Sequence, residues 1–106
     1  MTFVEITATI NEMKFEAVEN ILKGLNVPGL SVSDTKGFGA YKNHYHSDWM
    51  APYVRLQVYV QAADAERIAT AIIEAAHEGL DSDGVVAVSP VDRLFRISDK
   101  REIKPE

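Results

Sequence analysis

Cysteine is absent from the 106-residue sequence, which excludes disulfides, thiolate-bound zinc, iron–sulfur clusters and a cysteine nucleophile. No apolar run approaches the ~20 residues that a membrane-spanning helix needs. The first residues also lack the basic and apolar leader of a secretory signal. These absences predict a cytoplasmic protein with no direct membrane insertion.

Basic side chains are outnumbered by acidic ones, with 11 Lys and Arg against 16 Asp and Glu and a formal net charge of −5. A negative net charge disfavours binding to the phosphate backbone of a nucleic acid. Apolar residues make up 46% of the chain, as in an ordinary globular protein. At this length we expect one domain, spanning residues 1–106.

The first half of the chain predicts a strand, a helix and a second strand. Residues 3–10 alternate apolar and polar side chains, which is typical of a half-buried strand. Residues 13–25 carry apolar side chains three and four positions apart, as on one face of a helix. A break at Asn26-Val27-Pro28-Gly29 precedes renewed alternation in residues 30–34.

The second half repeats this pattern after a shift of fifty residues. The apolar positions of the first strand then fall on Val54, Leu56, Val58 and Val60. A helix is predicted over 63–78 with Gly79 after it, and the returning strand is predicted over 85–91. Two such βαβ units predict an α+β ferredoxin-like fold, in which both helices lie on one face of an antiparallel sheet.

Two segments lie outside the repeat, at 36–52 and 94–106. The first is a connection of 17 residues, which is long for a compact domain and therefore a candidate functional loop. In the second, Leu94 to Ile97 predict a short fifth strand before a charged end. Bare sheet edges and many β-branched residues predict that copies of the chain assemble with one another.

Short motifs in a fixed order carry a resemblance to a known family. In chain order they are Ser31-Val32-Ser33-Asp34, Lys36-Gly37-Phe38-Gly39, Asp83-Gly84, Pro90-Val91 and Arg96-Ile97. Over roughly residues 3–98, the chain resembles the PII family of trimeric nitrogen-regulatory signalling proteins.

The resemblance implies a regulatory protein and not an enzyme. It implies a homotrimer whose clefts between subunits bind adenine nucleotides, and a long loop that carries the nucleotide state to a partner protein. Glycines let the backbone approach a phosphate, and arginine offers a planar fork for its oxygens. The resemblance places the nucleotide site at Ser31, Gly37, Phe38, Gly39, Asp83, Gly84, Val85, Arg96, Ser98 and Arg101.

Three positions depart from the family's pattern. Ala40, Val85 and Ser98 stand where PII proteins usually carry a phosphate-binding cation. The loss of charge-assisted bonds matters most for the most highly charged ligand, so we expect ADP or AMP to bind better than ATP. The same departures leave open the alternative that nucleotide binding is lost.

The connection 36–52 is shorter than in nitrogen-sensing PII proteins and lacks their segment with the modified tyrosine. The chain is therefore more similar to the divergent PII-like proteins linked to bicarbonate handling, carboxysomes or metal export. Bicarbonate becomes a candidate second ligand, and the client becomes a transporter or a bicarbonate- or carboxysome-related protein. Candidate client contacts are Tyr41, Tyr45, Trp49 and Met50, with packing onto the protein's own subunits as the alternative.

The same connection holds a candidate metal site. His44 and His46 point the same way in an extended stretch, so they suit one divalent ion together with Asp48. Solvated or stacked histidines are the alternative. A trimeric divalent-metal-binding protein is therefore the rival function.

Catalysis has little support, because no spacing pairs a nucleophile with a base or two carboxylates with each other. His77 suits a favourable charge or hydrogen bond at the end of the second helix. No cofactor is expected beyond regulatory ligands. The candidate carboxylates, by type alone, are Glu5, Asp34, Asp81 and Asp83.

Overall fold

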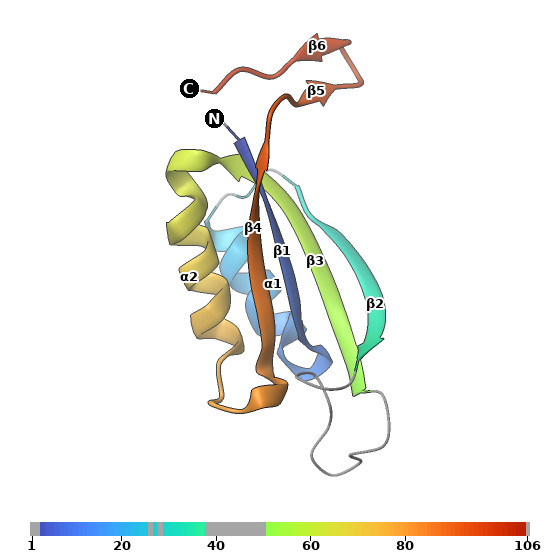
Figure 1. The fold of residues 1–106 in the computed structure, drawn as a ribbon, viewed down its shortest axis with the longest axis vertical. Coiled ribbons are helices and arrows are strands. Elements are labelled where there is room, and N and C mark those ends of the chain that lie inside the picture. The colour runs from blue at the N-terminus through green and yellow to red at the C-terminus, as the bar shows by residue number, and fades with distance from the viewer. Residues whose placement is uncertain (1–2, 26, 28, 38–50, 106) are drawn as a thin grey trace.

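The computed structural model describes residues 3–25, 27, 29–37 and 51–105, and it contains a four-stranded antiparallel sheet in the order β2-β3-β1-β4 (Figure 1). The strands are β1 (Phe3–Asn11), β2 (Ser31–Gly37), β3 (Ala51–Gln61) and β4 (Gly84–Val91). β1 is central and pairs with β3 on one side and β4 on the other. The edges of the sheet are therefore β2 and β4.

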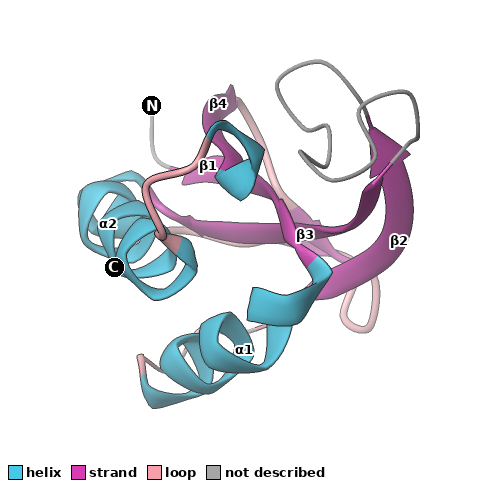
Figure 2. Cartoon of the chain, turned by 90° about the horizontal axis from the view of Figure 1, so that it is seen from below, coloured by secondary structure: helices cyan, strands magenta, loops and turns pink. Residues whose placement is uncertain are grey.

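Two helices cover one face of this sheet, as Figure 2 shows. They are α1 (Phe15–Gly24) and α2 (Ala65–Ala76), and each follows a single 3₁₀ turn, Glu12–Lys14 and Ala62–Asp64 respectively. The side chain of Asn11 accepts a hydrogen bond from the Met13 N–H at 2.8 Å, which satisfies one of the free donors where the chain turns into the first helix. In the described part of the chain, neither helix is long and apolar enough to cross a membrane.

The core lies between the helices and the sheet. The alternating residues of β1 that face the helices are at most 4% exposed, and the helices contribute apolar side chains at helical spacing. Burying these side chains is the main force that holds the helices on the sheet. The core residues are Val4, Ile6, Ala8, Ile10, Val18, Leu22, Val54, Leu56, Val58, Val60, Ile68, Ile72 and Ala76.

The ferredoxin-like double βαβ fold predicted from the sequence is confirmed, with small shifts in its elements. Both helices are shorter than the apolar periodicity suggests, because the first turn of each is a 3₁₀ turn. β2 runs on to Gly37, which pairs with Ala51, so the ends of the connection between the halves are already part of the sheet.

The C-terminal segment differs from the single strand expected at Leu94 to Ile97. It forms a separate two-stranded hairpin in which β5 (Phe95–Arg96) pairs with β6 (Arg101–Glu102). The turn between them is closed by a hydrogen bond from the Lys100 N–H to the Ile97 carbonyl at 3.3 Å, and Lys100 has a φ of 59°. We call residues 93–104 the C-terminal hairpin; Figure 1 shows it at the end of β4, beyond the main sheet.

Gly84 stands at the start of β4 with a φ of 107°, in the backbone region that favours glycine. It pairs with Ile10, and a Cβ atom there would overlap the carbonyl oxygen of Thr9. The close approach of β4 to β1 at this end of the sheet therefore requires glycine.

Replacing Gly84 with alanine should lower the free energy of unfolding by about 2–4 kcal/mol, because the side chain adds both backbone strain and a clash. Gly24→Ala is the matched control, since a Cβ atom at Gly24 meets nothing within 4 Å. That variant should be neutral or up to about 1 kcal/mol more stable. Denaturant unfolding of both variants is the measurement, and equal stability of Gly84→Ala and wild type would contradict this account.

Candidate functional site

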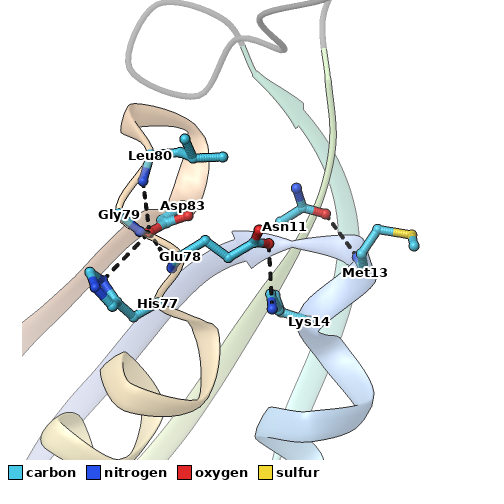
Figure 3. Close-up of polar contacts among 8 residues, drawn as sticks. All are labelled: Asn11, Met13, Lys14, His77, Glu78, Gly79, Leu80 and Asp83. Carbon is cyan, nitrogen blue, oxygen red and sulfur yellow. Dashed lines mark hydrogen bonds and ion pairs between the residues drawn. The ribbon is translucent and has the colours of Figure 1, made fainter.

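The turn between α2 and β4 is organised by one carboxylate, as Figure 3 shows. Oδ2 of Asp83 accepts hydrogen bonds from the N–H groups of Glu78 at 2.8 Å, Gly79 at 2.9 Å and Leu80 at 3.3 Å. The helix ends at Ala76 with His77 as its cap, so Gly79 lies two residues beyond the cap and not directly after the helix as predicted, and its φ of 92° lets the chain reverse there. The turn is thus folded around Asp83, although the sequence resemblance assigned this residue to the ligand.

Two opposing effects act on the pKa of Asp83. Partial burial raises it, while the three N–H donors and the nearby His77 lower it, and the net result is a pKa below the ordinary value. His77 Nδ1 lies 3.7 Å from Oδ2 of Asp83, so this histidine takes the position at the helix end that the sequence predicts. The turn is also tied to the start of α1 by a Lys14–Glu78 ion pair of 3.4 Å.

A cavity of about 390 Å³ opens beside this turn, between it and the second helix. We call it the turn-side cavity. Gly84 and Val85 line it together with apolar side chains such as Ile73 and Leu80. No lysine or arginine is among its described lining residues.

A second cavity, of about 400 Å³, lies between the sheet and the C-terminal hairpin. We call it the hairpin-side cavity. It brings together Ser31 and Arg96, two residues that the sequence assigns to one site, with Gln57 and Tyr59 of β3. Ser31 pairs directly with Gln57 in the β2–β3 register.

Gln57 and Tyr59 are lining residues that the sequence analysis missed. Both occupy the alternate positions of β3 that face away from the helices, where the neighbours in the sequence are buried apolar side chains. A hydrogen bond from Tyr59 to the Glu5 carboxylate, the charge of that carboxylate, and burial all raise the pKa of Tyr59. Polar residues on the uncovered face of a strand were the signal available in the sequence.

The C-terminal hairpin holds its charged side chains in local pairs. Nη1 of Arg96 donates to Oδ2 of Asp99 at 3.0 Å, and Arg93 donates through two nitrogens to the Glu102 carboxylate at 3.1 and 3.3 Å. The Arg93 guanidinium also lies over the ring of Phe95 at 4.8 Å. Ser98 and Arg101 are exposed on the same hairpin.

The two cavities lie far apart along the chain's own sheet. Gly84 begins β4 and the C-terminal hairpin follows its end, so the seven residue steps of that strand separate them by about 23 Å. Figure 1 shows the hairpin and the turn at opposite ends of the strand. Gly37 lies at the turn end of β2, whereas Ser31 begins that strand. One copy of the chain therefore does not bring all the predicted site residues together.

Several predicted residues lie outside the described part of the chain. They belong to the segment 38–50, and nothing in the described residues tests their roles. Among the described residues, no three His, Cys, Asp or Glu side chains are grouped so that they would hold a metal ion. The predicted residues outside the description are Phe38, Gly39, Ala40, Tyr41, His44, Tyr45, His46, Asp48, Trp49 and Met50.

The double βαβ fold, the long connection after β2 and the glycine-bearing turn before β4 are the features on which a comparison with known proteins can be based. The family model for "Nitrogen regulatory protein P-II" matches residues 3–101. The chain therefore belongs to the P-II family, as its motifs indicate, and P-II proteins are signal transducers without catalytic activity.

Curated relatives support this membership over most of the chain. The P-II protein of Azospirillum brasilense is 34% identical over 101 residues, which cover 88% of this chain and 89% of the relative. P-II protein 1 of Methanothermobacter thermautotrophicus is 34% identical over 103 residues, covering 91% and 90%. The crystal structure of Arabidopsis thaliana PII bound to citrate matches with a TM-score of 0.80 and 25% identity, covering 95% of this chain and 88% of that chain.

The lowered pKa of Asp83 predicts a pH-dependent contribution to stability. A carboxyl group with a lower pKa in the folded chain stabilises the fold above its unfolded pKa, and this contribution is lost as the pH falls through the folded pKa. Asp83→Asn should therefore lower the free energy of unfolding at pH 7 by about 1 kcal/mol. The difference from wild type should shrink as the pH falls below the ordinary carboxyl value of 3.8.

Asp81→Asn is the control for this measurement, because Asp81 lies exposed in the same turn. No hydrogen bond or ion pair of Asp81 occurs within the described residues. Its substitution should leave the pH profile of unfolding close to that of wild type. A destabilisation by Asp83→Asn that stays constant from pH 7 to pH 3 would contradict the role given to the carboxylate.

Proposed function

We propose that the protein is a homotrimeric signalling protein that binds adenine nucleotides in clefts between subunits. Each cleft would combine the hairpin-side cavity of one subunit with the turn-side cavity of the next. The observation that supports this most directly is the separation of the two sets of site residues at opposite ends of β4. A second copy is the simplest way to complete the site.

The hairpin-side cavity has the chemistry to hold a purine and an anionic group. Gln57 carries both a donor and an acceptor for a base edge, Ser31 adds a hydroxyl, and Tyr59 offers an aromatic face. Arg96 supplies a planar cation for phosphate oxygens. Adenine and one charged group are therefore matched within a single cavity.

The turn-side cavity suits a small phosphate chain better than a long one. Gly84 lines this cavity, but the described lining carries no lysine or arginine, and it includes Asp81 and Asp83. Together with Ala40 and Ser98, this composition favours ADP or AMP over ATP. Arg101 is the remaining hairpin cation that we assign to the cleft.

The segment 38–50 would carry the nucleotide state of the protein to a client protein. Gly37 and Ala51 pair at its two ends, so it emerges from the sheet at the same end as the turn that carries Gly84. A ligand that contacts both the turn and Gly37 stabilises the arrangement of residues 38–50 to which it binds more tightly. Tyr41, Tyr45, Trp49 and Met50 are the proposed contacts to the client.

The finer identity of the protein is also part of this proposal. The short connection favours the divergent PII-like group in the cytoplasm, with bicarbonate as a second ligand and a transporter or carboxysome-related protein as the client. A trimeric divalent-metal-binding protein that uses His44 and His46 is the rival function. Calorimetry with zinc tests it, because zinc binding by wild type that is lost in His44→Ala would favour the metal-binding function.

Arg96→Ala should weaken ADP binding about tenfold or more, because it removes the cation of the hairpin-side cavity. Arg93→Ala is the matched control, since the Arg93 guanidinium is held by Glu102 and does not line that cavity. It should change ADP affinity by less than about twofold. Titration calorimetry measures both, and an unchanged affinity of Arg96→Ala would remove this residue from the site.

Mixing two defective variants tests whether the cleft is shared between copies. Val85→Glu introduces a negative charge into the turn-side cavity, and Arg96→Ala disables the hairpin-side cavity, so each variant alone should bind ADP poorly. When the two are expressed together in equal amounts, about one third of the clefts in mixed trimers, and about a quarter of all clefts, should combine two intact halves. Recovery of ADP binding supports a shared cleft, and no recovery in trimers shown to be mixed contradicts it.

A further inference from the structure

We infer that Asp99 is a built-in competitor for Arg96 that sets how strongly the site discriminates against highly charged nucleotides. Asp99 has this role only if the hairpin-side cavity receives the nucleotide, as proposed above. It is not among the residues that the sequence assigns to the site. Its place in the C-terminal hairpin is what brings it to the ligand-binding cation.

The geometry holds the Asp99 carboxylate in place from two sides. One oxygen accepts from Nη1 of Arg96 at 3.0 Å, and the other accepts from the backbone N–H of Arg101 at 3.1 Å. The turn that joins β5 to β6 places the two residues three positions apart, and the left-handed backbone at Lys100 closes that turn. The carboxylate is therefore oriented toward Arg96 by the backbone itself.

Arg96 is the only lysine or arginine among the described residues that line the hairpin-side cavity. The other cations of the C-terminal hairpin with described partners, Arg93 and Lys104, are paired with Glu102. An anion that reaches Arg96 in this cavity therefore meets a cation that Asp99 already shares.

The effect of Asp99 grows with the charge of the ligand. A phosphate group that approaches Arg96 also approaches the Asp99 carboxylate, and their repulsion scales with the number of negative charges on the ligand. AMP, ADP and ATP carry increasing charge, so ATP loses most. The Arg96 and Asp99 side chains are 56% and 41% exposed, so the repulsion is screened by salt and its size is moderate.

Asp99→Asn tests this role, because asparagine keeps a side-chain oxygen for the Arg101 N–H and removes the charge. Calorimetry of the full chain with AMP, ADP and ATP should show that ATP gains affinity about two- to fivefold relative to AMP. The gain should shrink at high salt. Asp99→Ser, which also keeps an oxygen, should act in the same direction.

Glu19→Gln is the matched control. It makes the same change in net charge on α1, where Glu19 faces Lys23 at 3.9 Å and lines neither cavity. The ratio of ATP to AMP affinity should stay at the wild-type value. A shift in this control equal to that of Asp99→Asn would show an effect of net charge alone and overturn the role of Asp99.

The remaining outcomes separate this role from the proposed function. If wild type binds nucleotides and Asp99→Asn and Asp99→Ser keep its ATP-to-AMP ratio, Asp99 does not compete and the proposed function stands. If wild type binds none and Asp99→Asn binds, Asp99 blocks the site and the proposed function fails for the natural chain. If neither binds any of the three nucleotides, both are wrong.

Discussion

The pairing of β1 with a neighbour on each side is the constraint on which the structure depends. Its alternate residues fill the core against both helices, so a shift of one residue would turn the apolar face of β1 toward solvent. At one end this pairing brings the backbone of β4 so close to Thr9 of β1 that only glycine fits at position 84. The position of the turn-side cavity is thus fixed by the same register that builds the core.

The length of β4 has a second effect, on how a ligand site is built. The strand carries the chain from the turn to the C-terminal hairpin, and it separates two sets of polar and charged groups that suit one ligand. In the proposed trimer, assembly would convert these two surfaces into one closed site, and ligand binding would become sensitive to the arrangement of subunits.

The sequence predicts the fold well because the spacing of its apolar residues distinguishes strands from helices. Two strands, a helix and their repeat after fifty residues follow from apolar spacing, and the P-II motifs locate Ser31, Arg96 and Gly84. Apolar spacing and motifs do not predict the roles of Asp83 and Asp99, because these roles depend on hydrogen bonds from backbone N–H groups in turns. Spacing alone does not reveal the direction in which such a carboxylate points.

Gln57 and Tyr59 show a related limit. They fit the alternation of a strand as ordinary solvent-facing residues, and only the C-terminal hairpin, folded back near them, makes them part of a cavity. That hairpin has no counterpart in the βαβ repeat. The predicted fifth strand at Leu94 to Ile97 therefore had the right location, and its pairing partner came from the tail itself.

The Tyr53 side chain connects the start of β3 directly to the turn before β4. Its hydroxyl group is buried and donates to the Ser82 carbonyl at 3.0 Å, directly before Asp83 and Gly84, while its backbone lies two residues after the start of β3. A displacement of the start of β3 would therefore reach the glycine turn through this side chain as well as through the strand pairing. A partner that displaces the start of β3 would thus also displace the residues that line the turn-side cavity.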